Sequence, residues 1–187
     1  MNDIPAEVLK PVRDDIDSCC LSKEVMDTIN DPKTLKVLST TDEDGNPHTV
    51  YKSFMKALDD RAIIYVEMIY RSNTYKNMLR NKWANKSVSI TTWNPEKMTS
   101  YQIKAAPVAY LQNGPLWTEM IQMVWSMFPE ATPAGAWVLA PKEVINELYH
   151  ARQEEEDNRI LHSKLWRQYF GKQPKYPDIF LKKSPFK

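Results

Sequence analysis

The feature of this sequence that most constrains its fold is a succession of strand-length segments joined by tight turns. Residues 35–41 alternate with the period of two that a half-buried strand requires, and residues 42–47 are a dense cluster of turn formers. The strand pattern resumes over 50–58. A second turn at 59–60 precedes the continuously apolar segment 61–66, which is typical of a strand covered on both faces. These three segments predict an antiparallel meander.

The second half of the chain shows further hairpins with short helices between them. Strands are predicted over residues 87–93, 98–111 and 136–140, the last ending before Pro141. Helices are predicted over residues 74–81 and 115–128, the first with Ser72 or Asn73 as its N-cap. Because hairpin links, and not βαβ units, join about six strands, the fold class is mainly β. We expect a six-stranded antiparallel sheet closed into a small barrel, with helices plugging its ends.

The barrel is expected to occupy the middle of the chain, over residues 33–141. Residues 1–32 form an N-terminal segment with one short helix over 21–30, capped by Ser22. Residues 142–187 form a helical C-terminal extension and tail, in which 143–170 is charged and helix-prone.

Composition and charge exclude several classes of function. A formal net charge of +1 provides no basic face for nucleic acid or an anionic membrane surface. The four glycines stand too far apart for a dinucleotide-binding turn or a P-loop. No apolar run approaches the roughly 20 residues of a membrane-spanning helix. The N-terminal residues do not read as a secretory leader, and the adjacent Cys19 and Cys20 suit a reducing compartment, so a cytoplasmic location is expected.

The order of segments from residue 37 to residue 141 carries a family resemblance. The matching stretches are residues 37–50, 63–66, 71–81, 88–92 and 101–104. In these segments the chain resembles the pyridoxamine 5'-phosphate oxidase-like split barrels, a family that binds flavin mononucleotide (FMN). The resemblance implies an FMN-binding split barrel that forms a homodimer with flavin at the subunit interface. The six tryptophans and nine methionines of the chain independently favour a second subunit, because one small barrel buries only part of them.

The resemblance also implies a set of cofactor-binding residues. Phosphate or ribityl oxygens would be held by Arg71, Ser72, Thr74 and Asn77, with positive charge from Arg71 or Lys52. The flavin ring would be faced by Tyr51, Lys52 and Ser53, and Gln102 would hydrogen-bond a ring edge. A helix N-terminus offers unpaired N–H groups and a positive dipole end to an anion, which suits a phosphate at Ser72.

Simpler interpretations of the same residues stay open. Ser72 or Asn73 caps a helix in any case, Arg71 and Lys52 are equally compatible with solvated side chains, and Gln102 with the wet face of a strand. His48 is most simply a solvated turn residue. The three histidines are too few and too badly spaced for a metal centre, so no metal site is predicted, and no catalytic residue is assigned.

Function follows from the resemblance as an expectation. The chain would be an FMN-dependent, flavin reductase-like oxidoreductase that exchanges electrons or hydride with a small-molecule donor or acceptor. Residues 176–187 lack the arginine-rich substrate motif of true pyridoxamine phosphate oxidases, so vitamin B6 oxidation is not expected. The alternatives are a non-catalytic flavin-binding electron carrier or sensor, and a split barrel that binds F420, haem or no cofactor.

Overall fold

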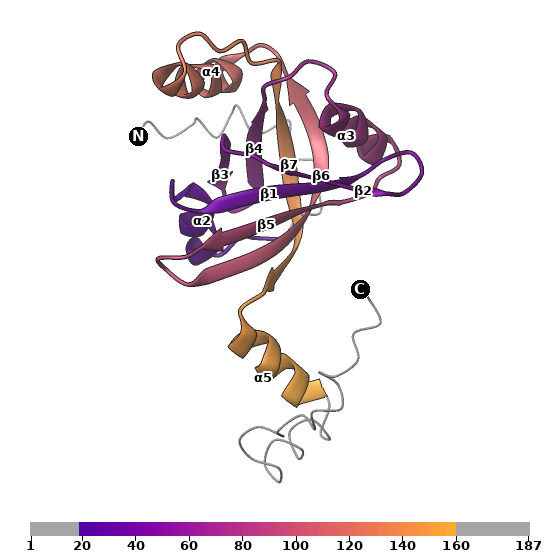
Figure 1. Ribbon diagram of the computed structural model, residues 1–187, viewed down its shortest axis with the longest axis vertical. Coiled ribbons are helices and arrows are strands. Elements are labelled where there is room, and N and C mark those ends of the chain that lie inside the picture. The colour runs from indigo at the N-terminus through magenta and orange to yellow at the C-terminus, as the bar shows by residue number, and fades with distance from the viewer. Residues whose placement is uncertain (1–18, 160–187) are drawn as a thin grey trace, which may run out of the picture. The chain divides into compact units, whose positions relative to one another are not determined.

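The computed structural model describes residues 19–159 of the 187-residue chain. These residues fall into two units that divide between Asn146 and Glu147. The first unit holds the sheet and three helices (Figure 1). The second unit, as far as it is described, consists of helix α5 (Tyr149–Arg159). Among the described residues no helix has the length and apolar character needed to cross a bilayer.

Along the chain, the elements of the first unit follow one another in the order α2-β1-β2-β3-β4-α3-β5-β6-α4-β7. The helices are α2 (Lys23–Asn30), α3 (Asn73–Trp83) and α4 (Pro115–Met127). The strands are β1 (Leu35–Thr41), β2 (Pro47–Tyr51), β3 (Met55–Asp59), β4 (Ala62–Glu67), β5 (Val88–Asn94), β6 (Thr99–Leu111) and β7 (Gly135–Asn146).

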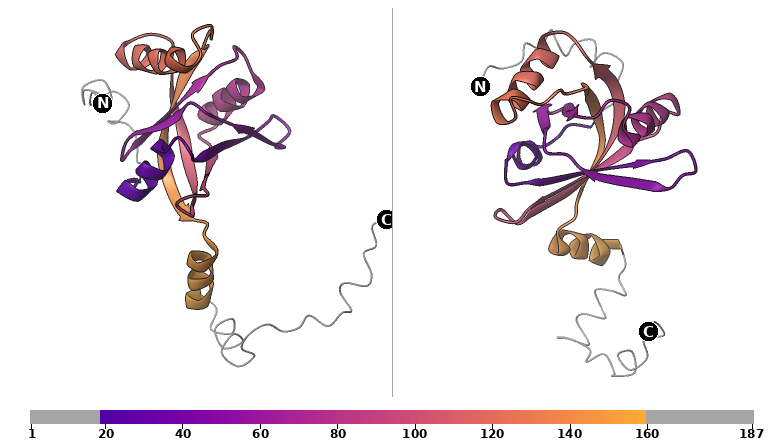
Figure 2. Two further views of the ribbon diagram at one scale, coloured as in Figure 1. Left: turned by 60° about the vertical axis from the view of Figure 1, so that its left-hand side comes forward. Right: turned by 45° about the horizontal axis from the view of Figure 1, so that its top comes forward.

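The seven strands form one antiparallel sheet in the order β2-β1-β5-β6-β7-β4-β3. Its two edge strands, β2 and β3, are consecutive in the chain and are joined by only Lys52, Ser53 and Phe54. A flat seven-stranded sheet would separate its edges by about 29 Å, whereas the four residue steps from Tyr51 to Met55 span at most about 14 Å. The sheet must therefore curl into a barrel, as Figure 2 shows.

The structure corrects the predicted number of strands. The predicted strand 50–58 is broken at Lys52–Phe54 into the end of β2 and all of β3, which gives seven strands in place of six. Both predicted hairpin pairings are present, since β1 pairs with β2 and β3 pairs with β4, but the break in the middle strand divides the meander into two hairpins at opposite edges of the sheet. The break falls where the chain crosses between the edges of the curled sheet: the Lys52 N–H donates to Lys36, and Phe54 accepts from Val66.

The last strand is longer than predicted. β7 continues through Pro141 to Asn146, and helix α5 begins at Tyr149 and not at residue 143. Pro141 pairs with Ala105, and the register of β6 against β7 shifts between Lys104 and Ala105. Proline is tolerated at such a bulge because the irregular ladder does not need the backbone N–H that proline lacks. Predictions for residues 1–18 and 160–187 lie outside the described residues.

The predicted helices are confirmed with small changes of boundary. Ser22 accepts a hydrogen bond from the Val25 N–H at the start of α2, and Ser72, not Asn73, caps α3. Helix α2 packs on strands β3 and β5, and helix α3 packs on strands β6 and β1. Their apolar residues enter the core inside the barrel.

Two hydrophobic clusters hold the first unit together. One fills the barrel interior around Leu38, Ile63 and Trp137, and the other lies under α4, whose Met120 and Val124 are buried. Strand β4 belongs to both clusters, since all six of its residues are buried. The prediction of a strand covered on both faces is therefore confirmed.

Helix α2 protects the exposed edge of the sheet through one side chain. The Asn30 amide donates to the Ala57 carbonyl at 3.1 Å and accepts from the Ala57 N–H at 2.9 Å, as a neighbouring strand would. Leaving both backbone groups without partners is costly, so Asn30→Ala is expected to lower the unfolding free energy by about 2 kcal/mol. Urea denaturation measures the loss. The control Asp27→Ala, which removes only an exposed partner of Lys23, should stay within about 0.5 kcal/mol.

Lys36 is a buried amine inside the barrel. Only 5% of it is exposed, and its Nζ donates to the Met55 carbonyl at 3.4 Å. Burial lowers the pKa of Lys36 from its ordinary value of 10.5, and the charge of Asp31 offsets part of that shift. Replacement by Met should therefore raise stability at pH 7 by about 1 kcal/mol.

The pH dependence of this gain has a defined sign. A depressed folded pKa makes stability rise as pH increases from that pKa towards 10.5, so the advantage of Lys36→Met should shrink over that window. Urea denaturation of both proteins at pH 7 and pH 10 measures the difference. An advantage that grew with pH would contradict the interpretation. The exposed Lys86→Met is the control, with a change below about 0.5 kcal/mol at either pH.

Candidate functional site

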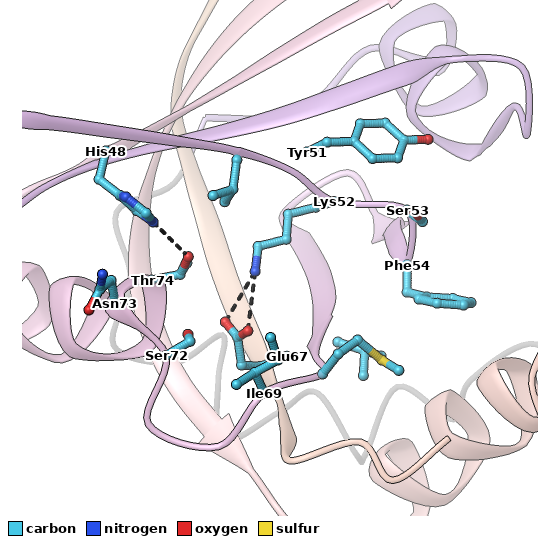
Figure 3. Close-up of a pocket in the computed structure, with 13 residues that line it drawn as sticks. His48, Tyr51, Lys52, Ser53, Phe54, Glu67, Ile69, Ser72, Asn73 and Thr74 are labelled. Carbon is cyan, nitrogen blue, oxygen red and sulfur yellow. Dashed lines mark hydrogen bonds and ion pairs between the residues drawn. The ribbon is translucent and has the colours of Figure 1, made fainter. Parts of the chain in front are cut away.

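A pocket of about 400 Å³ opens where the end of β2, the connection to β3, the end of β4 and the start of α3 converge (Figure 3). The chain crossing between the sheet edges forms one wall, and the loop from β4 into α3 forms the other. The lining residues are His48, Val50, Tyr51, Lys52, Ser53, Phe54, Val66, Glu67, Met68, Ile69, Ser72, Asn73 and Thr74.

An ion pair lies at the centre of this pocket. The Lys52 Nζ lies 3.2 Å and 3.3 Å from the two carboxylate oxygens of Glu67, and the side chains are only 12% and 4% exposed. The same Nζ lies 4.9 Å from the centroid of the Tyr65 ring, which adds a cation–π contact. Lys52 is the only lysine or arginine among the lining residues.

The N-terminus of α3 forms the polar end of the pocket. Ser72 Oγ accepts from the Tyr75 N–H at 3.0 Å, and Thr74 Oγ1 hydrogen-bonds His48 Nε2 at 3.2 Å. First-turn N–H groups have no partner within the helix, and they carry the positive end of its dipole. This end of the pocket is therefore suited to an anionic group.

Apolar side chains surround the opposite end. Phe54 packs edge-on against Phe128 with ring centroids 5.9 Å apart. Ser53, Phe54 and Met68 also line a second hollow of about 570 Å³, whose other residues lie at and beyond the end of α4. The pocket thus leads from a polar helix terminus to an apolar cleft that suits a flat ring.

Two buried phenols lie near the ion pair without hydrogen-bond partners. The hydroxyls of Tyr65 and Tyr110 are inaccessible, and neither makes a hydrogen bond within the described residues. Burial raises the pKa of Tyr65 well above its usual range, and the charge of Glu67 adds to this shift. The Tyr65 hydroxyl nevertheless makes no hydrogen bond of ordinary geometry to the Glu67 carboxylate. Burial raises the pKa of Tyr110 to about 12, and Tyr75 and then Glu67 add to the shift. Both phenols therefore remain protonated donors at neutral pH.

Five of the eight predicted cofactor residues line the pocket, namely Tyr51, Lys52, Ser53, Ser72 and Thr74. Arg71 does not: its backbone is left-handed, with φ of 53°, and its guanidinium lies 5.3 Å from the centroid of the Tyr70 ring. The turn brings Ile69 and Ser72 to the pocket while Arg71 remains exposed.

Asn77 and Gln102 lie elsewhere. Asn77 is buried, donates to Thr40 Oγ1 at 3.1 Å and accepts from Arg80 at 3.1 Å, and it lines a neighbouring polar hollow of about 440 Å³. Gln102 lies in the middle of β6, opposite Thr91 of β5 and Ile145 of β7. Neither residue lines the pocket in the single chain.

Two residues of the pocket were missed or misplaced by sequence reasoning. His48 belongs to β2 and not to a turn, and its bond to Thr74 ties that strand to α3. Glu67 was not considered, although a carboxylate at the end of an otherwise apolar strand is a signal of a buried charge. The described residues contain no group of three His, Cys, Asp or Glu side chains that could hold a metal ion.

Comparison with known proteins agrees with the fold. Residues 21–147 match the family described as pyridoxamine 5'-phosphate oxidase. The chain therefore belongs to the pyridoxamine 5'-phosphate oxidase-like family of split barrels. No protein with a curated description is similar enough to count as a match.

Several solved structures share the split-barrel fold. HupZ from Group A Streptococcus is 19% identical, with a TM-score of 0.58, over 69% of this chain and 95% of HupZ. An FMN-binding protein from Syntrophomonas wolfei is 16% identical, with a TM-score of 0.52, over 65% of this chain and 82% of that one. An F420 reductase is 13% identical, with a TM-score of 0.52, over 66% and 98%. At these identities the likeness establishes the fold alone.

The capping role of Ser72 can be separated from any role in ligand binding. Ser72→Ala removes the acceptor for the Tyr75 N–H and should lower the unfolding free energy by about 1 kcal/mol. Ser72→Asp retains a capping oxygen and adds a favourable charge at the helix N-terminus, so it should retain wild-type stability. Thermal denaturation of the three proteins checks both statements, and an Asp variant as unstable as Ala would contradict the capping assignment.

Proposed function

We propose that this chain binds FMN in the pocket between β2, β4 and α3 and acts as an oxidoreductase on a small-molecule donor or acceptor. The observation that carries the proposal is the order in which three features follow one another along the pocket: the N-terminus of α3, then a single lysine, then an apolar cleft. An FMN-binding protein with the same fold supports it.

The residues present fit the parts of FMN. The first-turn N–H groups of α3 and the Ser72 and Thr74 hydroxyls can donate to the phosphate, and Lys52 supplies the positive charge. Tyr51, Ser53 and Phe54 line the pocket and would contact the ring. FMN, when bound, would supply the transfer of electrons or hydride.

The chain's own residues would bind and orient the ring and keep water from one side of it. No acid or base is assigned to the reaction, because the redox chemistry belongs to the cofactor.

Exposure around the pocket supports a homodimer with the flavin at the interface. Tyr51 and Ile69 both line the pocket, yet they are 55% and 67% exposed, so one chain leaves the pocket partly open. A second copy covering these side chains would complete it. The roles of Arg71, Asn77 and Gln102 in cofactor binding stay predictions.

The test is flavin binding by matched variants. Purified protein is titrated with FMN and followed by flavin fluorescence, and its absorption spectrum is recorded after desalting. Lys52→Met should weaken FMN binding by roughly ten- to hundredfold, because it removes a charge-assisted contact. Arg71→Ala should weaken it less than about threefold, because Arg71 does not line the pocket. Equal losses would show that Arg71 turns inward to bind the phosphate.

Ser72→Asp provides a control for folding. This variant should keep its cap and its stability, but its carboxylate should repel the phosphate and weaken FMN binding by about tenfold or more. A protein that retains no flavin and binds none in titration would refute the FMN proposal and direct the search to F420 or haem. NADH or NADPH oxidation by flavin-loaded protein separates an oxidoreductase from an electron carrier, which should show almost none.

A further inference from the structure

The Lys52–Glu67 pair is not explained by stability alone. Both side chains are largely removed from water, at 12% and 4% exposure, and the desolvation of two such charges offsets most of their attraction. Apolar residues of similar size would serve the fold equally well. The pair also faces a pocket and not the packed core, which points to a role in binding.

Glu67 competes with any anionic ligand for Lys52. Lys52 is the only lysine or arginine that lines the pocket, and both oxygens of Glu67 already accept from its ammonium. A ligand phosphate at the N-terminus of α3 would have to draw Lys52 away. The carboxylate would then remain buried without a partner, at a large cost in free energy.

Two buried hydroxyl groups can donate hydrogen bonds that offset the cost of leaving Glu67 without Lys52. The Tyr65 and Tyr110 hydroxyls are buried and have no hydrogen-bond partner among the described residues. Tyr65 lies two residues before Glu67 on β4, and the phenol end of Tyr110 lies against Gly135, the residue of β7 that pairs with Glu67. Tyr65 also lies directly beneath the Lys52 ammonium, with 4.9 Å between Nζ and the ring centroid. Buried hydroxyls without partners are rare and call for an explanation. A carboxylate that exchanges its partner supplies one.

We propose that Glu67 is an exchangeable counter-ion: it pairs with Lys52 in the ligand-free pocket and releases it to an anionic ligand group. The Tyr65 and Tyr110 hydroxyls then donate to the freed carboxylate. Glu67 is thereby a specificity-determining residue that sets how strongly the pocket favours an anionic ligand over a neutral one. The inference rests on the proposed function in one respect, that the anionic group binds in this same pocket.

The first arm of the test compares FMN with riboflavin, which has the same ring without the phosphate. Glu67→Gln removes the competing charge and should tighten FMN binding by about tenfold while changing riboflavin affinity less than about twofold. Lys52→Met should abolish the preference for FMN. The double variant Lys52→Met/Glu67→Gln should behave as Lys52→Met, because Glu67 acts through Lys52.

The hydroxyl variants test the exchange without disturbing the pair. Tyr65→Phe/Tyr110→Phe removes two groups that have no partner in the ligand-free protein, so the melting temperature should move by less than about 2 °C. FMN binding should weaken about fivefold, and this loss should vanish in the Glu67→Gln background. Tyr101→Phe is the matched control: it removes the hydroxyl of another buried tyrosine that does not line the pocket, so FMN affinity should be unchanged.

A second probe separates this inference from the cofactor proposal. Inorganic pyrophosphate is added to each variant, and the shift in melting temperature is recorded. If FMN does not bind but pyrophosphate stabilises the protein, more so in Glu67→Gln and not in Lys52→Met, the cofactor proposal fails and the counter-ion stands. If FMN does not bind and pyrophosphate stabilises neither the wild type nor Glu67→Gln, the counter-ion proposal is overturned.

Two results in the flavin arm would also overturn it. A Glu67→Gln protein that binds FMN more weakly would show that Glu67 only positions Lys52. Unchanged FMN affinity in Tyr65→Phe/Tyr110→Phe would show that the phenols do not receive the carboxylate. The second result is available even if Glu67→Gln does not fold.

Discussion

The three-residue connection from β2 to β3 is the constraint on which the rest of the structure depends. Because Lys52, Ser53 and Phe54 must join the two edges of a seven-stranded sheet, the sheet can only exist curled. The curl brings the end of β2 beside the end of β4 and the start of α3, three segments that no hydrogen-bond ladder joins directly. The same connection forms one wall of the pocket, so the element that closes the fold also supplies side chains that line the candidate site.

Electrostatics in the pocket depend on a single positive side chain. Lys52 follows the last residue of β2, and Glu67 is the last residue of β4, so the curl of the sheet makes them partners across the barrel mouth. Burial strengthens their attraction and also makes each costly to leave alone. The availability of Lys52 to a ligand therefore depends on whether Glu67 keeps its ion pair with Lys52. In the proposed exchange, the Tyr65 and Tyr110 hydroxyls belong to the site although they do not line the pocket.

Local patterns predicted most of the elements, and failed where a tertiary contact overrides the pattern. Alternation identified β1 and β5, a long run of strand-forming residues identified β6, and continuous apolar character identified β4 as buried on both faces. The strand break at Lys52–Phe54 was missed because the apolar residues that follow continue the pattern. Pro141 was taken as a strand end because its bulge depends on the register of β6, which is not visible in one segment.

The sequence by itself determined the fold class and the family, since these follow from local patterns and segment order. It limited the cap of α3 to Ser72 or Asn73, and the family resemblance indicated Tyr51, Lys52, Ser53, Ser72 and Thr74, which line the pocket. Only the tertiary structure decided that Arg71 turns away, that His48 joins Thr74, and that Lys52 is held by Glu67. The physical reason is that burial and ion pairing depend on which strand ends lie next to one another. The curl of the sheet decides this, and no pattern within a single segment of the sequence encodes it.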